Sequence, residues 1–564
     1  MFLNLFSKPK VKVHGGKINP TVLLVLDGWG IAPPSEGNAI ALAKPKNYNE
    51  FLANYPHAEL LAAGESVGLP ANEVGNTEVG HLNMGAGRVI LQDLKRIDKS
   101  IEDGSFFENK SFYRALFHAQ KNKSKLHLVG LLSSGQVHSS AKHLYALLEF
   151  LKRNNAQNVF LHLFTDGRDA PPEEAASVFE KLESYLKANK IGQVATVGGR
   201  YYGMDRDKRW ERTQKAYDAM VKGIGPVALT SVEAIKQNYA KKITDEFIEP
   251  TVISKNGLIS NNDAVIFFNY RIDRPRQITM SIVVKDFEGT NISWEFDPYS
   301  VKYEKKHEEN TANIITKEPF PRGNPPLNLY SVTMTQYQKN LPVNEVAFPP
   351  EEVIDCLTEV LSKKQIAQMH MSESEKERFV TYYFDGLREE RMAGEDVKII
   401  PSPHVPTYDK RPQMSVAELA EEFKKVLNED KYNFIIMNIA NPDMVAHSGK
   451  IPETIKAIGA VDLALGEIVG GVLTCNGTIL ITGDHGNAEE MITYPSSSYF
   501  FTSKAGTMNT DHSSNPVPII IINNSLKNSN KPIPNGKLAD IAPTILKLMG
   551  IEIPPVMTGK NLLG

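Results

Sequence analysis

Short apolar runs bounded by turn-forming residues recur along the chain and dominate its pattern of hydrophobic and polar positions. They predict buried β-strands in TVLLVLDGWG, KLHLVGLLSSG, NVFLHLFTDGRD, DAVIFFNYRIDR, RFVTYYFDG, NFIIMNIANPD, GTILITGDHGN and PVPIIIIN. Segments with apolar residues every three or four positions predict helices between them, as in KHLYALLEFLKRN, EEAASVFEKLESYLKAN, MSVAELAEEFKKVLNE and TIKAIGAVDLALGEIVGGVL. This alternation predicts an α/β fold with a largely parallel sheet, in which sites form beyond the carboxyl ends of the strands.

The length of the chain, 564 residues, exceeds what one hydrophobic core usually organises, so we expect two or more domains. The 63 Lys and Arg residues nearly balance the 66 Asp and Glu residues, and the formal net charge is -3. This balance predicts neither a nucleic-acid surface nor an acidic tail. Any binding of anions must therefore come from local clusters of positive charge.

The two cysteines, Cys356 and Cys475, cannot build a disulfide framework, which favours a reducing compartment and predicts a cytoplasmic protein. The start, MFLNLFSKPKVKVHGG, has too few consecutive apolar residues for a signal peptide, and PVPIIIINN is too short to span a bilayer. We therefore expect no membrane association. Residues 1–19 are predicted to form a loosely ordered tail, with MFLNLF as an alternative docking patch.

The segment NEVGNTEVGHLNMGAGR, residues 72–88, places Thr77 among four glycines. Glycines around a hydroxyl residue predict a sharp backbone turn that approaches another group closely. Thr77 could be the cap of a helix that begins there. It could equally be a reactive hydroxyl, because a helix N-terminus favours the negative charge of a phosphate.

Predicted strand ends supply a set of potential metal ligands. They are Asp27 in LDGWG, Asp443 and His447 in NPDMVAH, Asp484 and His485 in GDHGN, and His512 in DHSSNPVP. Carboxylates mixed with imidazoles, without thiolates, suit Mn²⁺ or Zn²⁺, and there are enough ligands for two ions. A pair of metals is a common device for phosphoryl transfer to a hydroxyl, which makes Thr77 the candidate nucleophile.

The motifs LDGWG, GNTEVGHLNMGAGR, DGRD, GGRYYGMDRDKRWERT, NPDMVAHSGK, TGDHGNAEEM and NPVP together closely resemble the cofactor-independent phosphoglycerate mutases of the alkaline phosphatase superfamily. The likeness runs in order from about residue 20 to residue 564. It implies interconversion of 3-phosphoglycerate and 2-phosphoglycerate in glycolysis and gluconeogenesis, through a phosphorylated enzyme. It also implies two bound Mn²⁺ ions, with Zn²⁺ or another divalent metal as an alternative, and no need for 2,3-bisphosphoglycerate. We expect a monomer that binds phosphoglycerate as its small-molecule substrate and does not bind nucleic acid.

The resemblance also implies roles for individual residues. It places one Mn²⁺ on Asp443, His447 and His512, and the other on Asp27, Thr77, Asp484 and His485. It gives contacts with the substrate to His138, Arg168, Asp169, Arg200, Arg206, Arg271, Arg274 and Lys376. Arginine suits this task because its planar fork grips phosphate and carboxylate oxygens in pairs. Thr77 would accept the phosphoryl group, Lys376 would offset charge, and Asp169, held by Arg168, would relay protons between the glycerate hydroxyls.

The chain departs from the family pattern in places. The family nucleophile is normally serine, and Thr77 adds a methyl group beside the reactive oxygen. Before His138 the family usually has Asp-Gly-Gly-Val-His, whereas this chain has SGQVH, with Ser134 and Gln136 substituted. Two stretches, residues 294–328 and 493–510, are longer than the family core, and we assign them no function.

The order of the motifs predicts a discontinuous architecture. Ligands from both ends of the chain must meet, so residues 20–90 and 331–564 are predicted to form an alkaline-phosphatase-like, three-layer, metal-binding domain. Residues 91–330 would then be an inserted α/β domain that binds substrate. Two chain crossings would make a hinge, and closure would exclude water from the reaction.

Two rival functions use many of the same residues. A metal-dependent phosphate-monoester hydrolase of the same superfamily would need the metals and the nucleophile but not the arginine set of the insertion. A non-catalytic relative could have lost the serine, but the complete set of metal ligands argues against such decay. Formation of 2-phosphoglycerate from 3-phosphoglycerate with added Mn²⁺ would separate the three.

Overall fold

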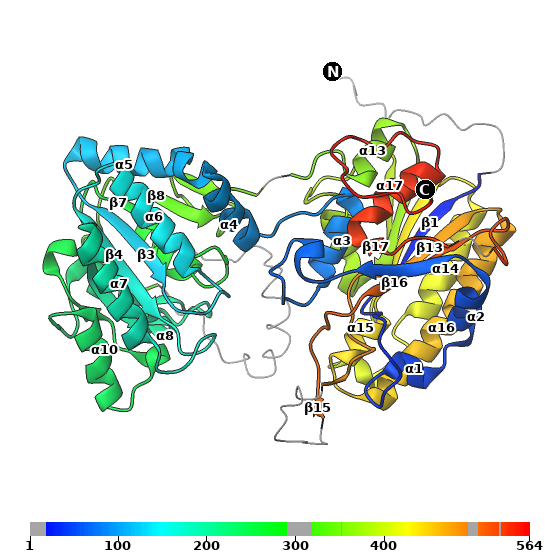
Figure 1. Cartoon of the computed structure of the whole chain (residues 1–564), viewed down its shortest axis with the longest axis horizontal. Helices are drawn as coiled ribbons and strands as arrows, with labels where there is room; N and C mark the ends of the chain where they lie inside the picture. The colour runs from blue at the N-terminus through cyan, green and yellow to red at the C-terminus, as the bar shows by residue number, and fades with distance from the viewer. Residues whose placement is uncertain (1–17, 290–318, 351, 494–505, 530–531) are drawn as a thin grey trace. The chain divides into compact units, whose positions relative to one another are not determined.

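The computed structural model describes residues 18–289, 319–350, 352–493, 506–529 and 532–564. Contacts divide the chain into two compact units (Figure 1): unit 1 comprises residues 1–92 and 351–564, and unit 2 comprises residues 93–350. The second crossing lies about twenty residues later than the position expected from the sequence. The reason is that two further strands after residue 329 pair with the sheet of unit 2. Residues 1–17, and most of 294–328 and 493–510, lie outside the described residues.

Unit 1 is built on an eight-stranded sheet with the order β11-β10-β12-β1-β13-β16-β2-β17. The strands are β1 (Thr21–Leu26), β2 (His57–Leu61), β10 (Gln368–Glu373), β11 (Glu395–Ile400), β12 (Phe434–Ile439), β13 (Thr478–Gly483), β16 (Val517–Ile522) and β17 (Gly536–Lys537). All neighbours run parallel except β16, which is antiparallel to both β13 and β2. A separate pair joins β14 (Ile492–Thr493) to β15 (Thr507–Met508).

Helices cover both faces of this sheet. One layer contains α1 (Ala39–Ala43), α2 (Lys46–Asn54), α14 (Val416–Asn428) and α16 (Ile451–Thr474), and the other contains α3 (Thr77–Ala86), α13 (Leu357–Lys363) and α17 (Ile541–Leu548). The central strand β1 has apolar side chains on both faces, which explains why both are covered. Val22 and Leu24 join the core under the first layer, while Leu23 and Val25 join the core under the second, since side chains alternate along a strand. The predicted three-layer domain is confirmed.

Among the described residues, one helix, α16, is long and apolar enough to cross a membrane. Half of its apolar window is buried inside unit 1. Ile458, Val461 and Leu465 belong to the core beneath the first helical layer. The apolar face of α16 is therefore used in packing against the sheet.

Unit 2 has a seven-stranded sheet with the order β6-β5-β4-β3-β7-β8-β9, parallel except for β6. The strands are β3 (Leu126–Leu131), β4 (Val159–Thr165), β5 (Gln193–Gly199), β6 (Thr251–Val252), β7 (Ala264–Phe267), β8 (Tyr330–Thr335) and β9 (Glu345–Phe348). The helices are α4 (Asp93–Asp103), α5 (Lys110–Asn122), α6 (Ala141–Arg153), α7 (Ala175–Asn189), α8 (Arg200–Gly203), α9 (Trp210–Tyr217), α10 (Ser231–Ala240) and α11 (Arg276–Val283).

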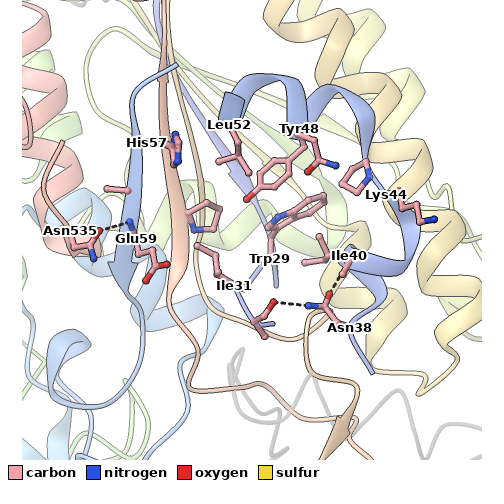
Figure 2. A pocket seen from close by; sticks show the side chains of 17 residues that line it. Trp29, Ile31, Asn38, Ile40, Lys44, Tyr48, Leu52, His57, Glu59 and Asn535 are labelled. Atoms are coloured by element: carbon pink, nitrogen blue, oxygen red, sulfur yellow. Dashed lines mark hydrogen bonds between the residues drawn. The ribbon is translucent and has the colours of Figure 1, made fainter. Parts of the chain in front are cut away.

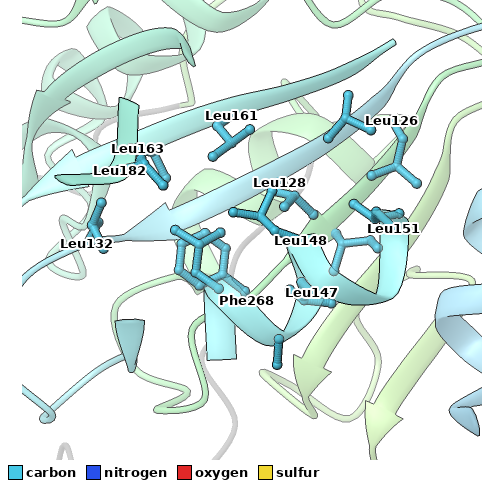
Figure 3. Close-up of a cluster of buried hydrophobic side chains, with 14 of the residues drawn as sticks. Leu126, Leu128, Leu132, Leu147, Leu148, Leu151, Leu161, Leu163, Leu182 and Phe268 are labelled. Atoms are coloured by element: carbon cyan, nitrogen blue, oxygen red, sulfur yellow. The ribbon is translucent and has the colours of Figure 1, made fainter. Parts of the chain in front are cut away.

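A leucine-rich core fills one side of the unit 2 sheet (Figure 3). Leu126 and Leu128 of β3 and Leu161 and Leu163 of β4 meet Leu147 of α6 there. On the other face of the same strands a second core gathers around α9 and α11. Unit 2 is thus a second α/β layered domain, and the predicted fold class holds for both units.

One predicted strand is wrong. RFVTYYFDG forms a π-helical turn, η7 (Phe379–Tyr383), rather than a strand. Its buried side chains are Val380, Tyr383 and Phe384, which have helical rather than alternating spacing. The rings of Phe379 and Tyr383 stack with centroids 5.5 Å apart, as expected for residues one helical turn apart.

Candidate active site

The acidic residues predicted as metal ligands in unit 1 meet where three parallel strands end. Asp27 follows β1, Asp484 follows β13, and Asp443 lies in the short helix α15 (Asn441–Ala446) after β12. Since β1 lies between β12 and β13, these chain segments run side by side. Gly28 has φ +70°, and a Cβ there would come 2.8 Å from the Asp443 Cβ. Glycine is required at this turn because the two segments approach so closely.

The three predicted histidine ligands share one arrangement. In each, Nδ1 donates to a backbone carbonyl: His447 to Thr510 at 2.7 Å, His512 to Gly75 at 2.8 Å, and His485 to Gly486 at 3.2 Å. Nε2 of His447 and Nε2 of His512 face each other at 3.2 Å, and lie 3.0 and 3.3 Å from Asp443 Oδ1. Histidines that bind metals are typically fixed in this way, with the second nitrogen bonded to a carbonyl.

Thr77 and Lys376 lie among these ligands. Thr77 Oγ1 is 3.0 Å from His485 Nε2, and Lys376 Nζ donates to Thr77 Oγ1 at 3.1 Å. Lys376 also donates to Asp27 Oδ1 at 2.8 Å and to Asp443 Oδ2 at 2.9 Å. All of these side chains are buried. The structure therefore brings together the nucleophile and the lysine predicted from the sequence.

Thr77 is the first residue of α3 and is not its cap. The cap is Asn76, whose Oδ1 accepts a hydrogen bond from Val79 N. The alternative in which Thr77 serves as a helix cap is therefore wrong. The Thr77 hydroxyl is left to face the carboxylates and imidazoles at the amino end of the helix, where the helix dipole favours negative charge.

The electrostatics of this cluster are unbalanced. Burial and the neighbouring Asp443 raise the pKa of Asp27 to about 6, although Lys376 opposes the shift. Burial and Asp27 hold the pKa of Asp484 well above its usual value. Burial would lower the pKa of Lys376, but Asp27, Asp443 and Asp484 outweigh it and raise the pKa. Three buried carboxyl groups thus face one ammonium group, which does not supply enough positive charge to keep the pKa values of Asp27 and Asp484 at their usual level.

These residues fit a divalent metal centre. Asp484 Oδ2 is buried and makes no hydrogen bond. The ligand atoms of Asp443, His447 and His512 all lie within 4.8 Å of one another, and so do those of Asp27, Asp443 and His485. The first group is the predicted ligand set of one ion. The second shares Asp27 and His485 with the predicted set of the other ion, and Asp443 lies close enough to contribute to both.

Residues that the sequence analysis missed hold these ligands in place. His81 stands one helical turn after Thr77, and its Nδ1 donates to the Thr77 carbonyl at 3.0 Å. Asn438 donates to Asp27 Oδ2 at 2.8 Å and contacts His81 Nε2 at 3.1 Å. Burial lowers the pKa of His81 to about 3, so the ring is neutral. His81 lies in the glycine-containing motif around Thr77, and Asn438 lies near the end of a predicted strand, so their positions in the sequence could have suggested both.

Unit 2 gathers the predicted substrate residues at the carboxyl end of its own sheet. Arg200 follows β5 and donates to Asp166 Oδ1 at 2.7 Å and to Asp169 Oδ2 at 2.5 Å. His138 Nε2 lies 3.4 Å from Asp169 Oδ2, and its Nδ1 lies 3.6 Å from Asp273 Oδ1. Asp166 and Asp273 were missed from the sequence, although each stands beside a predicted residue, in TDGRD and in NYRIDR.

Two of the remaining arginines contact Asp273, and the other two have different partners. Arg206 Nη1 lies 2.6 Å from Asp273 Oδ2, and Arg271 Nε lies 3.2 Å from Asp273 Oδ1. Arg274 donates to the Met204 carbonyl at 3.2 Å. Arg168 is more exposed, and Nη1 lies 3.7 Å from Glu246. Asp169 thus takes its contacts from Arg200 and His138, whereas Arg168 was expected to hold it.

Positive charge is in excess in this cluster. Burial, together with Arg200 and Arg206, lowers the pKa of Arg274 to about 10. Burial acts to raise the pKa of Asp273, but Arg271 and the other neighbouring cations lower it to about 2. Burial lowers the pKa of His138 to about 2. A cluster in which neighbouring arginines help to lower the pKa of Arg274 is suited to bind an anion.

The substituted residues before His138, Ser134 and Gln136, are both exposed. Ser134 donates through its hydroxyl to Glu174 at 2.7 Å, and its backbone N–H donates to the same carboxylate at 2.8 Å. The departure from the family motif therefore affects the outer side of the loop and leaves His138 buried.

A cavity of about 570 Å³ lies elsewhere in unit 1 (Figure 2). Its wall includes Trp29, Ile31, Tyr48, Leu52 and His57. None of the predicted site residues lines it, although Trp29 comes two positions after Asp27. Its wall also carries Lys44 and Glu59, but it contains neither Thr77 nor any of the predicted metal ligands.

This chain is similar to known proteins over almost its whole length. A family model described as the BPG-independent PGAM N-terminus matches residues 97–339. The 2,3-bisphosphoglycerate-independent phosphoglycerate mutase of Clostridium beijerinckii is 45% identical over 548 residues, which cover 96% of this chain and 99% of that protein. The enzyme of the same name from Clostridium perfringens is 44% identical over 548 residues, with the same coverage.

A solved structure extends the match to three dimensions. The Leishmania mexicana phosphoglycerate mutase, crystallised at low cobalt concentration, is 27% identical and covers 99% of both chains with a TM-score of 0.60. The match spans both units, since the region covered is nearly the whole chain. The order of the elements in this protein therefore has a counterpart in a solved structure.

Proposed function

Because this chain belongs to the family of 2,3-bisphosphoglycerate-independent phosphoglycerate mutases, which interconvert 3-phosphoglycerate and 2-phosphoglycerate, we propose that Thr77 carries the phosphoryl group between the two positions. The observation that supports Thr77 is its place in unit 1. Its hydroxyl lies at the start of α3, 3.0 Å from His485 and 3.1 Å from Lys376, beside the carboxyl groups of Asp27 and Asp484, whose pKa values are raised.

In the first half of the proposed reaction, the phosphorus atom bonds to Thr77 Oγ1 as its bond to the glycerate oxygen breaks. The Thr77 proton leaves, and the released glycerate oxygen takes up a proton. In the second half, the other glycerate hydroxyl attacks the phosphorus atom and Thr77 is restored. The ammonium group of Lys376 stays charged, because Asp27 and Asp443 raise its pKa, and it stabilises the negative charge of the transferring group.

Two divalent ions complete the unit 1 site in this proposal. Asp443, His447 and His512 would hold one, and Asp27, Thr77, Asp484 and His485 the other. Bound there, the ions supply positive charge that lowers the pKa of the nucleophile and neutralises phosphoryl oxygens. We propose Mn²⁺, because carboxylate and imidazole ligands without thiolate suit it.

The arginine cluster of unit 2 is proposed to bind the phosphate and carboxylate of the substrate. Arg200, Arg206, Arg271 and Arg274 offer paired donors for these anions, and Arg168 stands at the exposed edge. Asp169 and His138, 3.4 Å apart, are the groups that could move a proton between glycerate hydroxyls. A hydrolase would have no use for this set. A cytoplasmic location and a monomeric state stay predictions from the sequence.

The test combines turnover with trapping of the intermediate. The full chain, stripped of metal with a chelator, should regain conversion of 3-phosphoglycerate when Mn²⁺ is added, without 2,3-bisphosphoglycerate. Acid quenching with ³²P-labelled substrate, followed by mass spectrometry, should place the label on Thr77. Label on another residue, or full activity in protein shown by elemental analysis to be metal-free, would reject the proposed roles.

A further inference from the structure

A second buried polar cluster lies in unit 1, away from the site described above. It consists of His370 of β10, Glu395 at the start of β11, and Asp385, which follows η7. Glu395 is the first residue of its strand, so the cluster lies toward the amino ends of the strands, whereas Asp27 and Asp484 lie beyond carboxyl ends. None of its members takes part in the proposed reaction.

The sheet register places these residues on one face. Gln368 and His370 are two positions apart on β10, so their side chains point to the same side of the sheet. Glu395 is the parallel neighbour of Gln368 and therefore shares that side. Met369 and Met371 belong to the core of the opposite face. The cluster is thus beneath the layer that contains α13, where Asp385 covers it.

Hydrogen-bond acceptors outnumber donors in this cluster. Glu395 Oε1, Asp385 Oδ1, His370 Nε2 and Gln368 Oε1 are all buried and make no hydrogen bond. Two nearby donors are already committed: His370 Nδ1 donates to the Val380 carbonyl at 2.6 Å, and Gln368 Nε2 donates to the Thr358 carbonyl at 3.0 Å. Burial of unpaired acceptors costs free energy, so a positively charged partner is expected.

The surrounding side chains do not supply that partner. Arg388 donates to Glu359 at 3.0 Å while its buried Nε makes no hydrogen bond, Thr358 forms a side-chain hydrogen bond with Asp385, and Arg391 is exposed to solvent. The charges of the two arginines are felt at Asp385 and Glu395, yet the pKa of each carboxyl is raised, because burial outweighs them. Burial also lowers the pKa of His370 to about 4, so the imidazole is neutral and offers a lone pair.

We propose that His370, Asp385 and Glu395 bind a divalent transition-metal ion of the Zn²⁺ type as a structural site. One ring nitrogen of His370 and one oxygen from each carboxylate lie within 4.8 Å of one another. His370 Nδ1 is 3.9 Å from both Asp385 Oδ1 and Glu395 Oε1. The His370 ring is therefore next to both carboxylates, and movement of the two carboxylate side chains toward Nε2 would give the bonds of roughly 2.0–2.2 Å that Zn²⁺ makes.

The bond from His370 Nδ1 to the Val380 carbonyl leaves Nε2, which is buried and makes no hydrogen bond, as the ring nitrogen with a free lone pair. Nε2 is therefore the proposed ligand, because imidazoles that bind metals usually donate their other nitrogen to a carbonyl. An ion in this cluster would cross-link β10, β11 and the segment after η7. Since η7 follows Lys376, the ion would also stabilise the segment that carries this lysine into the active site.

The test counts metal ions in the full chain loaded with Zn²⁺ and freed of loosely bound metal. The wild-type protein should hold one ion more than the double variant Asp385→Asn/Glu395→Gln, which keeps size but removes both charges. The matched control Glu377→Gln/Glu390→Gln removes the same charge from exposed positions of the same segment and should keep the wild-type count. Equal counts in the wild-type protein and the double variant would overturn the proposal.

A second measurement covers the case in which the double variant does not fold. Anomalous diffraction at the zinc edge from wild-type crystals should show a peak among His370, Asp385 and Glu395. The competing arrangement is a proton shared by the two carboxyl groups. It predicts no peak there, and it predicts that Zn²⁺ raises the melting temperature of the wild-type protein no more than that of the double variant. Either of those results would refute the metal site.

Discussion

Unit 1 and unit 2 use the same architecture to gather opposite charges. Each has a mostly parallel sheet whose carboxyl edge presents buried ionisable groups. In unit 1, three carboxylates surround Lys376 and raise its pKa, whereas in unit 2 neighbouring arginines help to lower the pKa of Arg274. The unit 1 cluster is suited to bind metal cations, and the unit 2 cluster is suited to bind anions. An enzyme that acts on a phosphorylated acid needs both.

The largest expected effect is on kcat and comes from removing the proposed nucleophile of unit 1. Thr77→Ala is expected to lower kcat by roughly 10⁴-fold or more, as removal of a nucleophile does in other enzymes. Far-UV circular dichroism and Mn²⁺ content should change little. Thr77→Ser is the matched variant and should remain active, because it keeps the hydroxyl and removes only a methyl group. An alanine variant with near-normal initial rates would show that Thr77 is not the acceptor.

Removal of the cation from the acidic cluster should destabilise unit 1. Lys376→Met leaves Asp27 and Asp443 without their ammonium partner, and breaking such a buried pair costs about 3–5 kcal/mol. Urea unfolding in the presence of a chelator should reveal this loss. Added Mn²⁺ should recover part of it by replacing the missing charge.

The matched control for this experiment is Lys364→Met, which removes an exposed lysine of the same unit. It should change the free energy of unfolding by no more than about 0.5 kcal/mol. A Lys376→Met protein that is as stable as this control would contradict the charge imbalance inferred for unit 1.

Removal of a cation from the arginine cluster should have the opposite consequence for stability. Arg274→Gln relieves repulsion from Arg200 and Arg206, so the melting temperature without substrate should stay the same or rise. KM should rise by about 10- to 100-fold, because a charged hydrogen bond to the substrate contributes about 1.5–3 kcal/mol. The control is Arg153→Gln, an exposed arginine of unit 2. A lower melting temperature with unchanged KM would contradict a binding role.

The smallest effect concerns the pH dependence of unit 2. His127 contacts His162 and Asp263 at 3.0 Å each, and burial lowers the pKa values of both histidines from 6.5. The unfolded chain therefore binds protons that the folded unit does not. Stability is fully present above pH 6.5 and falls below it, by up to about 1.4 kcal/mol per pH unit for each histidine.

Hydrogen exchange of β3 and β4 amides, corrected for intrinsic rates, should report this loss between pH 7 and pH 5. Asp27 of unit 1 has the opposite sign: its pKa is raised from 3.8 to about 6, so its contribution in metal-free protein decreases as pH rises through that range. Protection of β3 and β4 that does not change with acidification would count against the neutral histidine network.

The sequence by itself was sufficient for the strand ends and their chemistry. Asp27 and Asp484 each stand directly after an apolar run, and the end of such a run can be read from the sequence. The ordered motifs also identified the family and the insertion of one α/β domain into another. These features are local, or depend only on the order of segments, so they can be inferred without coordinates.

Tertiary structure decided the rest, because the remaining features depend on partners far apart in the chain. The second domain crossing moved to residue 350 since β8 and β9 pair with the sheet of unit 2. RFVTYYFDG became a π-helical turn because its apolar residues pack on one side. His370 and Glu395 lie on one face of the sheet only because β10 and β11 pair in the observed register, and a shift by one residue would separate them. Burial, which sets the charge state of Lys376, Arg274 and these carboxyl groups, is a property of the folded chain and not of the residue type.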